Sequence, residues 1–243
     1  MEVHHHPQVE KKSFKEYFLE FLMIFLAVTM GFFAENYREH LAEVNKENDY
    51  IQTFIEDLKT DTTKIKQLLY IERSLKLKAI DSLLFLMCTH QIKGHENDLY
   101  YFGRIVTRYP IFQSNDRTVT ELKNSGSLRL IRNEATADSI ISYQKAVEEI
   151  YTVQDDENAE RKDLYPILCR MYDPFIFDKM AEGFKIIRPN DNPPLRSYDT
   201  NIQKDLAFYI SEIKGSDNLV IRNLQNLETK AENVIAFLQK KYY

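Results

Sequence analysis

One apolar stretch near the N-terminus constrains this chain more than any other feature. Residues 21–34 contain no charged side chain, and Glu20 and Glu35 stand directly on either side. Alone, this stretch makes a helix of about 21 Å, which is too short for a hydrocarbon core of about 30 Å. The helix reaches about 30 Å if it extends to Tyr17 and Tyr37, because aromatic rings are typical of the membrane interface. The stretch therefore predicts a transmembrane helix between these two tyrosines.

Two alternatives to an uncleaved span are a signal peptide and a buried helix of a soluble core. Lys11, Lys12 and Lys15 form a positive segment ahead of the apolar stretch, as in a signal peptide. Cleavage after Ala34 would place the large Phe32 where a small residue is needed. We therefore expect an uncleaved span in the inner (cytoplasmic) membrane. The upstream lysines favour a cytoplasmic N-terminus and a periplasmic C-terminal domain.

Glycine and proline are rare in the first part of the chain, which is typical of long helices. Between Ser13 and His90, Gly31 is the sole residue of either kind. We predict an all-α fold in which an N-terminal transmembrane helix continues into a long helical stalk and a helical-bundle soluble domain. The predicted segments are a cytoplasmic segment at 1–16, a transmembrane helix at 17–37, a long helix or stalk at 38–90 and an extracytoplasmic helical domain at 91–243.

The predicted stalk carries an apolar repeat of seven residues. Its members are Val44, Ile51, Leu58 and Ile65. The repeat fits a coiled-coil seam, and it fits equally an amphipathic helix that packs onto its own domain. The sequence leaves both interpretations open. We also expect a bend in this helix at residues 60–63.

Capping residues and helix breakers divide the domain into further helices. Asn115 or Asp116 is expected to cap a short helix, and Gly126 is expected to end it as a structural turn with a positive φ angle. Asn133 is the predicted cap of a long helix that breaks near Pro166. These assignments place an ordered helical domain after the stalk.

The last part of the chain is predicted from breakers and apolar periodicity. Residues 172–200 contain most of the prolines and are expected to form an irregular surface loop with a short helical piece around Asp178 to Gly183. Two separate helices are expected after it, with apolar positions at 202–213 and at 220–238. The acid-rich segment 154–162 is interpreted as a solvated helical face.

The side chains needed for enzymatic chemistry do not form a recognisable motif. The sequence has no glycine-rich phosphate loop, nucleophile elbow, HExxH helix or paired CxxC spacing. We therefore predict no enzyme, no catalytic residue and no cofactor. A net charge of −5 with mixed signs gives no basic stripe, so nucleic acid is not an expected partner.

Histidine and cysteine give no predicted metal site. The histidines at 4–6 are contiguous near the N-terminus and would bind metals loosely, and His90 and His95 do not share a helix face. Cys88 and Cys169 fit no metal or redox spacing. They form either one disulfide or, as we expect, two buried thiols.

The predicted span itself carries the candidate functional residues. Ala27 and Gly31 lie four residues apart on one helix face, where small side chains let two helices approach closely. Glu20 and Glu35 lie near the same face and are candidate intramembrane carboxylates. Self-association through this face would make the protein a homo-oligomer.

Three segments resemble an uncharacterised family, a domain of unknown function, of single-span membrane proteins from Gram-negative bacteria. The first is LEFLMIFLAVTMGFFAENYRE, in which Glu20, Asn36, Tyr37 and Glu39 match the family. The second is YIQTFIEDLKTDTTKI, which matches over 54–59, and the third is ELKNSGSLRLIRN, which matches over 121–131. The resemblance implies an anchor followed by a helical domain, and it implies no activity, substrate or cofactor.

These observations predict a membrane-anchored structural or interaction protein, an oligomeric scaffold or accessory subunit. Its expected partners are membrane lipid and either a second copy or another membrane protein. One alternative is a periplasmic four-helix ligand-sensing module that acts with a partner. The other is a subunit of a membrane ion or proton pathway, in which Glu20 or Glu35 would carry the ion.

Overall fold

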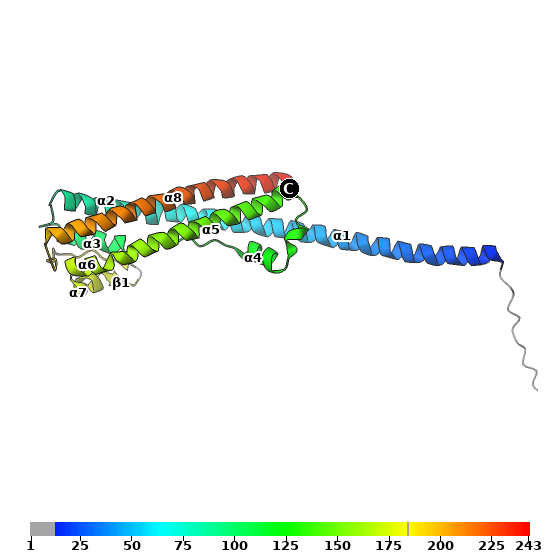
Figure 1. The fold of residues 1–243 in the computed structure, drawn as a ribbon, viewed down its shortest axis with the longest axis horizontal. Helices are drawn as coiled ribbons and strands as arrows, with labels where there is room; N and C mark the ends of the chain where they lie inside the picture. Colours follow the sequence, from blue (N-terminus) through cyan, green and yellow to red (C-terminus); the bar gives the residue numbers. More distant parts are fainter. Residues whose placement is uncertain (1–12, 184) are drawn as a thin grey trace, which may run out of the picture. The chain divides into compact units, whose positions relative to one another are not determined.

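The computed structural model describes residues 13–183 and 185–243 of a chain that divides into two compact units, Met1–Asp49 and Tyr50–Tyr243. Helix α1 (Phe14–Gln67) begins in the first unit and continues into the second (Figure 1). The described residues are mostly helical, and the two strands have only two residues each. The predicted all-α class is confirmed.

In the first unit, α1 is long and apolar enough to span a membrane. Its most apolar 18-residue window is 0% buried within the chain. The large side chains are open to the surroundings, with 66% of Met23 and 70% of Phe33 exposed. An apolar helix surface of this size is costly in water, where exposed patches of several hundred Å² mark an interaction surface.

The second unit is built from long helices joined by short ones. In chain order they are α1 from residue 50, the π-helix η1 (Leu68–Arg73), α2 (Ser74–Cys88), α3 (Glu96–Val106), α4 (Arg117–Asn124), the 3₁₀ helix η2 (Ser127–Leu130), α5 (Glu134–Asp163), α6 (Tyr165–Met171), α7 (Pro174–Lys179) and α8 (Thr200–Tyr242). The strands β1 (Ala181–Glu182) and β2 (Lys185–Ile186) pair antiparallel. Helices α5 and α8 run side by side along this unit (Figure 1).

The seven-residue repeat of α1 packs inside the chain's own domain. Ile51, Leu58 and Ile65 are 0% exposed and belong to a core shared with α5 and α8. Of the two interpretations left open by the sequence, the amphipathic helix that packs onto its own domain describes this part of α1. Burying three such side chains stabilises the domain by about 1.5–3 kcal/mol each.

The bend expected at residues 60–63 is wrong, because α1 continues to Gln67. The threonine hydroxyls donate to carbonyl oxygens one turn earlier, as Thr62 does to Leu58 at 2.8 Å. Such bonds satisfy the hydroxyls inside a helix without interrupting it. The irregularity comes later, at the π-helix η1.

Helix α4 is capped from another helix, not by its own first residues. Asp116 stands at the N-cap without a side-chain cap bond, and the carboxylate of Asp57 accepts from the backbone N–H of Thr118 at 2.9 Å. One turn further along α1, Asp61 accepts from the backbone N–H of Asn115 at 2.6 Å and from the Tyr143 hydroxyl at 2.9 Å. These two buried acids fasten the loop before α4 to α1 and α5.

Two later boundaries agree with their sequence signals. Gly126 follows α4 with φ of 66°, in the left-handed region expected of it. Asn133 caps α5, where its side chain accepts from the backbone N–H of Thr136 at 3.1 Å. Helix α5 ends at Asp163, and α6 begins with Pro166 in its first turn.

The C-terminal expectations need two corrections. The two predicted helices are one, α8, because the helical apolar pattern runs through Gly215 and a single glycine costs a helix only about 1 kcal/mol. The loop at 172–200 begins with α7 and a β-hairpin whose turn contains Gly183, with φ of 57°. Pro174 starts α7, which places the helical piece earlier than expected.

Candidate functional site

Four charged side chains lie buried where three long helical segments meet, and we call them the charge layer. Arg73 ends η1, Lys76 lies in α2, Glu157 in α5 and Asp217 in α8, and each is at most 1% exposed. Arg73 pairs with Glu157, at 3.0 Å between Nη1 and Oε2, and with Asp217. Lys76 pairs with Glu157 and, at 3.7 Å, with Asp217. The positive and negative charges balance, as buried charges require.

The charge layer separates two apolar cores. Along α8, the side chains up to Ile213 belong to one core, Asp217 follows, and the side chains from Val220 belong to the other. The segment from α1 to α2 shows the same order of core, charge and core, and so does the chain from α5 into α6, where Leu164 is the first side chain of the second core. The layer is therefore a polar cross-section of the domain, enclosed on both sides by apolar packing.

The π-helix decides which residue enters the charge layer. The repeat that runs to Ile65 would next bury Glu72, but Glu72 is only half-buried and Arg73 is fully buried. A π-helical turn holds more residues than an α-helical turn, so the repeat moves by one residue. It then continues through the buried Ile80 and Met87.

Arg73 connects the layer to the segment after α3. Its Nη2 donates to the carbonyl oxygen of Pro110 at 2.7 Å. Its Nε and the Oδ2 of Asp217 have no hydrogen-bond partner among the described residues. Burial raises the pKa of the Asp217 carboxyl, and the charges of Lys76 and Arg73 oppose this rise. The layer is thus held by strong but incompletely satisfied contacts.

Gln154 extends the polar layer by one turn of α5. Its side chain accepts from the backbone N–H of Phe112 at 2.6 Å and donates to the carbonyl oxygen of Phe112 at 3.1 Å. The hydroxyl of Tyr109 donates to the carbonyl oxygen of Gln154. Burial, followed by the charge of Glu157, raises the pKa of Tyr109 to about 12. These bonds fix the segment 109–112 against α5.

The prediction that 154–162 is a solvated face is wrong for Gln154 and Glu157, which are 3% and 0% exposed. The sequence did contain a sign of this. Gln154 and Glu157 continue the three- and four-residue steps of the buried side of α5, and Asp217 does the same on α8. A charge that falls on a buried stripe predicts a partner on another helix. The partner's identity is visible only in the fold.

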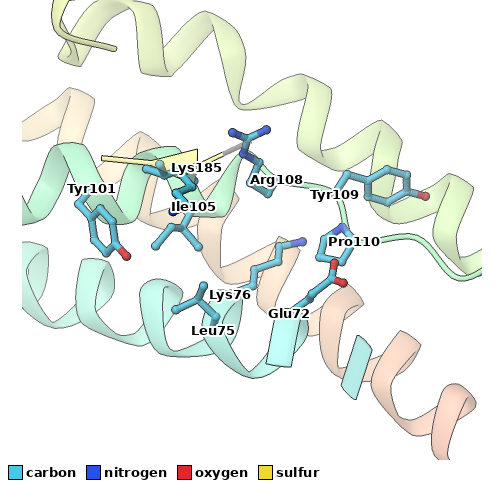
Figure 2. Close-up of a pocket in the computed structure, with 10 residues that line it drawn as sticks. Glu72, Leu75, Lys76, Tyr101, Ile105, Arg108, Tyr109, Pro110 and Lys185 are labelled. Carbon is cyan, nitrogen blue, oxygen red and sulfur yellow. The ribbon is translucent and has the colours of Figure 1, made fainter. Parts of the chain in front are cut away.

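Beside the charge layer, a cavity of about 600 Å³ opens between α2, α3, the segment after α3 and β2 (Figure 2). Its lining carries three cationic side chains and one carboxylate, together with aliphatic and tyrosine side chains. The lining residues are Glu72, Leu75, Lys76, Tyr101, Ile105, Arg108, Tyr109, Pro110, Lys185 and Ile186. In Figure 2 the side chain of Lys76 extends from α2 toward the wall formed by Arg108 and Pro110. None of these residues was a sequence candidate.

The predicted site residues of the span all lie in the first unit. Ala27 and Gly31 are exposed, and a Cβ atom at Gly31 would meet no heavy atom within 4 Å. Glu35 accepts hydrogen bonds from the guanidinium of Arg38, with 3.0 Å between Oε2 and Nε. Glu20 lies within the same helix. The role of Ala27 and Gly31 in helix association and that of Glu20 and Glu35 in ion binding stay predictions.

Histidine and cysteine gave no predicted metal site, and the two cysteines were expected to be buried. The histidines at 4–6 lie outside the described residues. Within residues 13–183 and 185–243, no group of three or more His, Cys, Asp or Glu side chains is arranged to hold a metal ion. Cys88 and Cys169 are free and exposed, so the expectation that they are buried is wrong.

A comparison of the chain with protein-family models, curated proteins and solved structures finds no match.

Proposed function

We propose that this chain is a membrane-anchored structural or interaction protein whose helical-bundle domain lies outside the cytoplasm. The observation that supports the proposal is the exposure of an apolar helix long enough to cross a bilayer. In lipid the exposed side chains from Phe18 to Phe33 become favourable contacts, and the backbone of a helix needs no partner there. We also propose that the protein lies in the inner membrane and is related to the family of single-span membrane proteins that its three segments resemble.

The rest of the proposal concerns what the domain does at the membrane. A scaffold or accessory subunit must present a fixed surface, and the second unit has two apolar cores and an enclosed charge layer that fix its helices against one another. Ala27 and Gly31 leave a shallow face on the anchor at which two copies, or another membrane protein, can pack closely.

Membrane fractionation of the full chain tests the anchor. Leu26→Arg combined with Val28→Arg places two charges at the middle of the span, at about 2.5–3.5 kcal/mol each, and should move the protein to the soluble fraction. Phe85→Arg combined with Phe208→Arg is the matched control, because these side chains are 59% and 62% exposed on the second unit. The control should remain with the membrane. If carbonate extracts the wild type and both variants from the membrane to the same extent, the proposal is contradicted.

Protease protection tests the topology. A tag at the C-terminus should be digested in spheroplasts and protected in inverted vesicles. The opposite pattern would place the domain in the cytoplasm. A mature chain whose mass shows cleavage near Glu35 would remove the anchor altogether.

A further inference from the structure

We infer that the cavity beside the charge layer binds a small organic anion, in which a carboxylate or phosphate group is joined to an apolar portion. The inference goes beyond the anchoring role and does not depend on it. It concerns a site on the second unit alone, and it rests on the charges, the fixed positions and the apolar walls of the cavity.

The first observation is that two cationic side chains meet at the cavity without partners. Arg108 follows α3 and Lys185 lies in β2, and neither side chain has a hydrogen bond or ion pair among the described residues. The nearby Arg188 differs, because it pairs with Asp98 at 2.5 Å. Like charges held on one cavity repel each other, and an anion between them converts this repulsion into attraction.

The second observation is the position of Lys76. Its ammonium group has three donors, one of which is used on Glu157, while Asp217 lies at 3.7 Å, beyond hydrogen-bond distance. The charge layer holds this ammonium at the edge of the cavity with 1% of Lys76 exposed. A donor whose position is already fixed loses little entropy when a ligand binds, which favours affinity.

The third observation is the apolar part of the lining. Leu75, Ile105 and Ile186 supply aliphatic walls, and Tyr101 supplies an aromatic one. Pockets for small organic ligands have volumes of about 300–1,000 Å³ and combine such walls with a few polar groups. The volume of about 600 Å³ and these walls favour an organic anion over inorganic phosphate alone.

Calorimetric titration of the full chain in an uncharged mild detergent tests the inference. The probe is phenyl phosphate, which joins a dianion to an aromatic ring. Inorganic phosphate lacks the ring and benzyl alcohol lacks the charge. Phenyl phosphate should bind at one saturable site and more tightly than either comparison compound. Benzyl alcohol binding as tightly as phenyl phosphate, or no binding of phenyl phosphate, would overturn the inference.

Four variants locate the site. Arg108→Gln and Lys185→Gln should each lower the affinity for phenyl phosphate about 10-fold, the effect of losing one charged hydrogen bond. Arg222→Gln and Lys78→Gln are matched controls, because both residues are exposed and lie outside the cavity lining. They should bind as the wild type does. Wild-type affinity in both Arg108→Gln and Lys185→Gln would refute the site.

Chemical protection provides a second measurement on the wild-type chain. Acetic anhydride should modify Lys185 and Lys78 in the free protein, and phenyl phosphate should protect Lys185 alone. Equal modification of Lys185 with and without the probe would also refute the site. The anchor proposal is tested by fractionation and is untouched by either result.

Discussion

Arg73→Met removes one charge from the charge layer and is expected to destabilise the second unit by about 3–5 kcal/mol. Methionine replaces most of the side-chain volume, so the cost comes from electrostatics and hydrogen bonding. Glu157 and Asp217 would share Lys76 as their remaining cation in the layer, leaving a buried net charge of −1. The carbonyl oxygen of Pro110 would also lose its donor. The unsatisfied carbonyl oxygen alone costs about 1–3 kcal/mol. The uncompensated buried charge adds to this cost and brings the expected loss to about 3–5 kcal/mol.

Urea unfolding of the full chain in mild detergent, followed by far-ultraviolet circular dichroism, measures the loss. Arg170→Met is the control, because Arg170 pairs with Asp205 at 3.7 Å and both side chains are 53% exposed. A surface pair of this kind is worth about 0–1 kcal/mol. The denaturant slope should be unchanged in both variants, since the exposed area on unfolding is nearly the same.

Combining Arg73→Met with Asp217→Leu tests whether the charges act as one unit. The double variant leaves Lys76 opposite Glu157 with no net charge, so it should be more stable than Arg73→Met alone. Additive losses in the double variant, or a loss below 1 kcal/mol in Arg73→Met, would show that these charges are not enclosed as described.

Further predictions concern two glycines, one buried tyrosine and the two glutamates of the predicted span. Gly126→Val should destabilise the domain by more than about 1 kcal/mol through strain at φ of 66°. Gly215→Ala should stabilise it by about 0.5–1 kcal/mol, because that glycine is inside α8. Thermal unfolding should show a lower melting temperature for the first variant and a higher one for the second. Burial raises the pKa of Tyr143, so the folded chain keeps a proton that the unfolded chain loses above about pH 10, and stability should fall as pH rises beyond that point. Tyr143→Phe should make this alkaline loss smaller in urea unfolding at pH 9 to 11, and an unchanged loss would refute the assignment. Glu20→Gln and Glu35→Gln should leave membrane insertion and oligomer size in detergent unchanged, because in the proposed span from Tyr17 to Tyr37 both residues would lie near the headgroup layers. A wild-type ion flux that these variants abolish would instead favour the ion-pathway alternative.

The sequence predicted the all-α class and the apolar helix because both depend on local composition and periodicity. Gly126 and Asn133 were predictable for the same reason, since a left-handed turn and an N-cap are set by one residue and its immediate neighbours. The two helices expected within 202–238 are one helix, because the single glycine at 215 costs too little to interrupt the continuing apolar pattern.

The tertiary structure alone decided the site. Asp57 caps α4 from a helix 61 residues away, and Arg73 meets partners 84 and 144 residues along the chain. A charge on a buried stripe can be recognised in sequence, but its partner depends on helix register, which the π-helix changes by one residue at Arg73. The cavity likewise joins side chains from α2, α3 and β2. Periodicity determines which face of a helix is buried, whereas long-range packing determines what that face meets, because contacts between helices are fixed only when all of them are placed together.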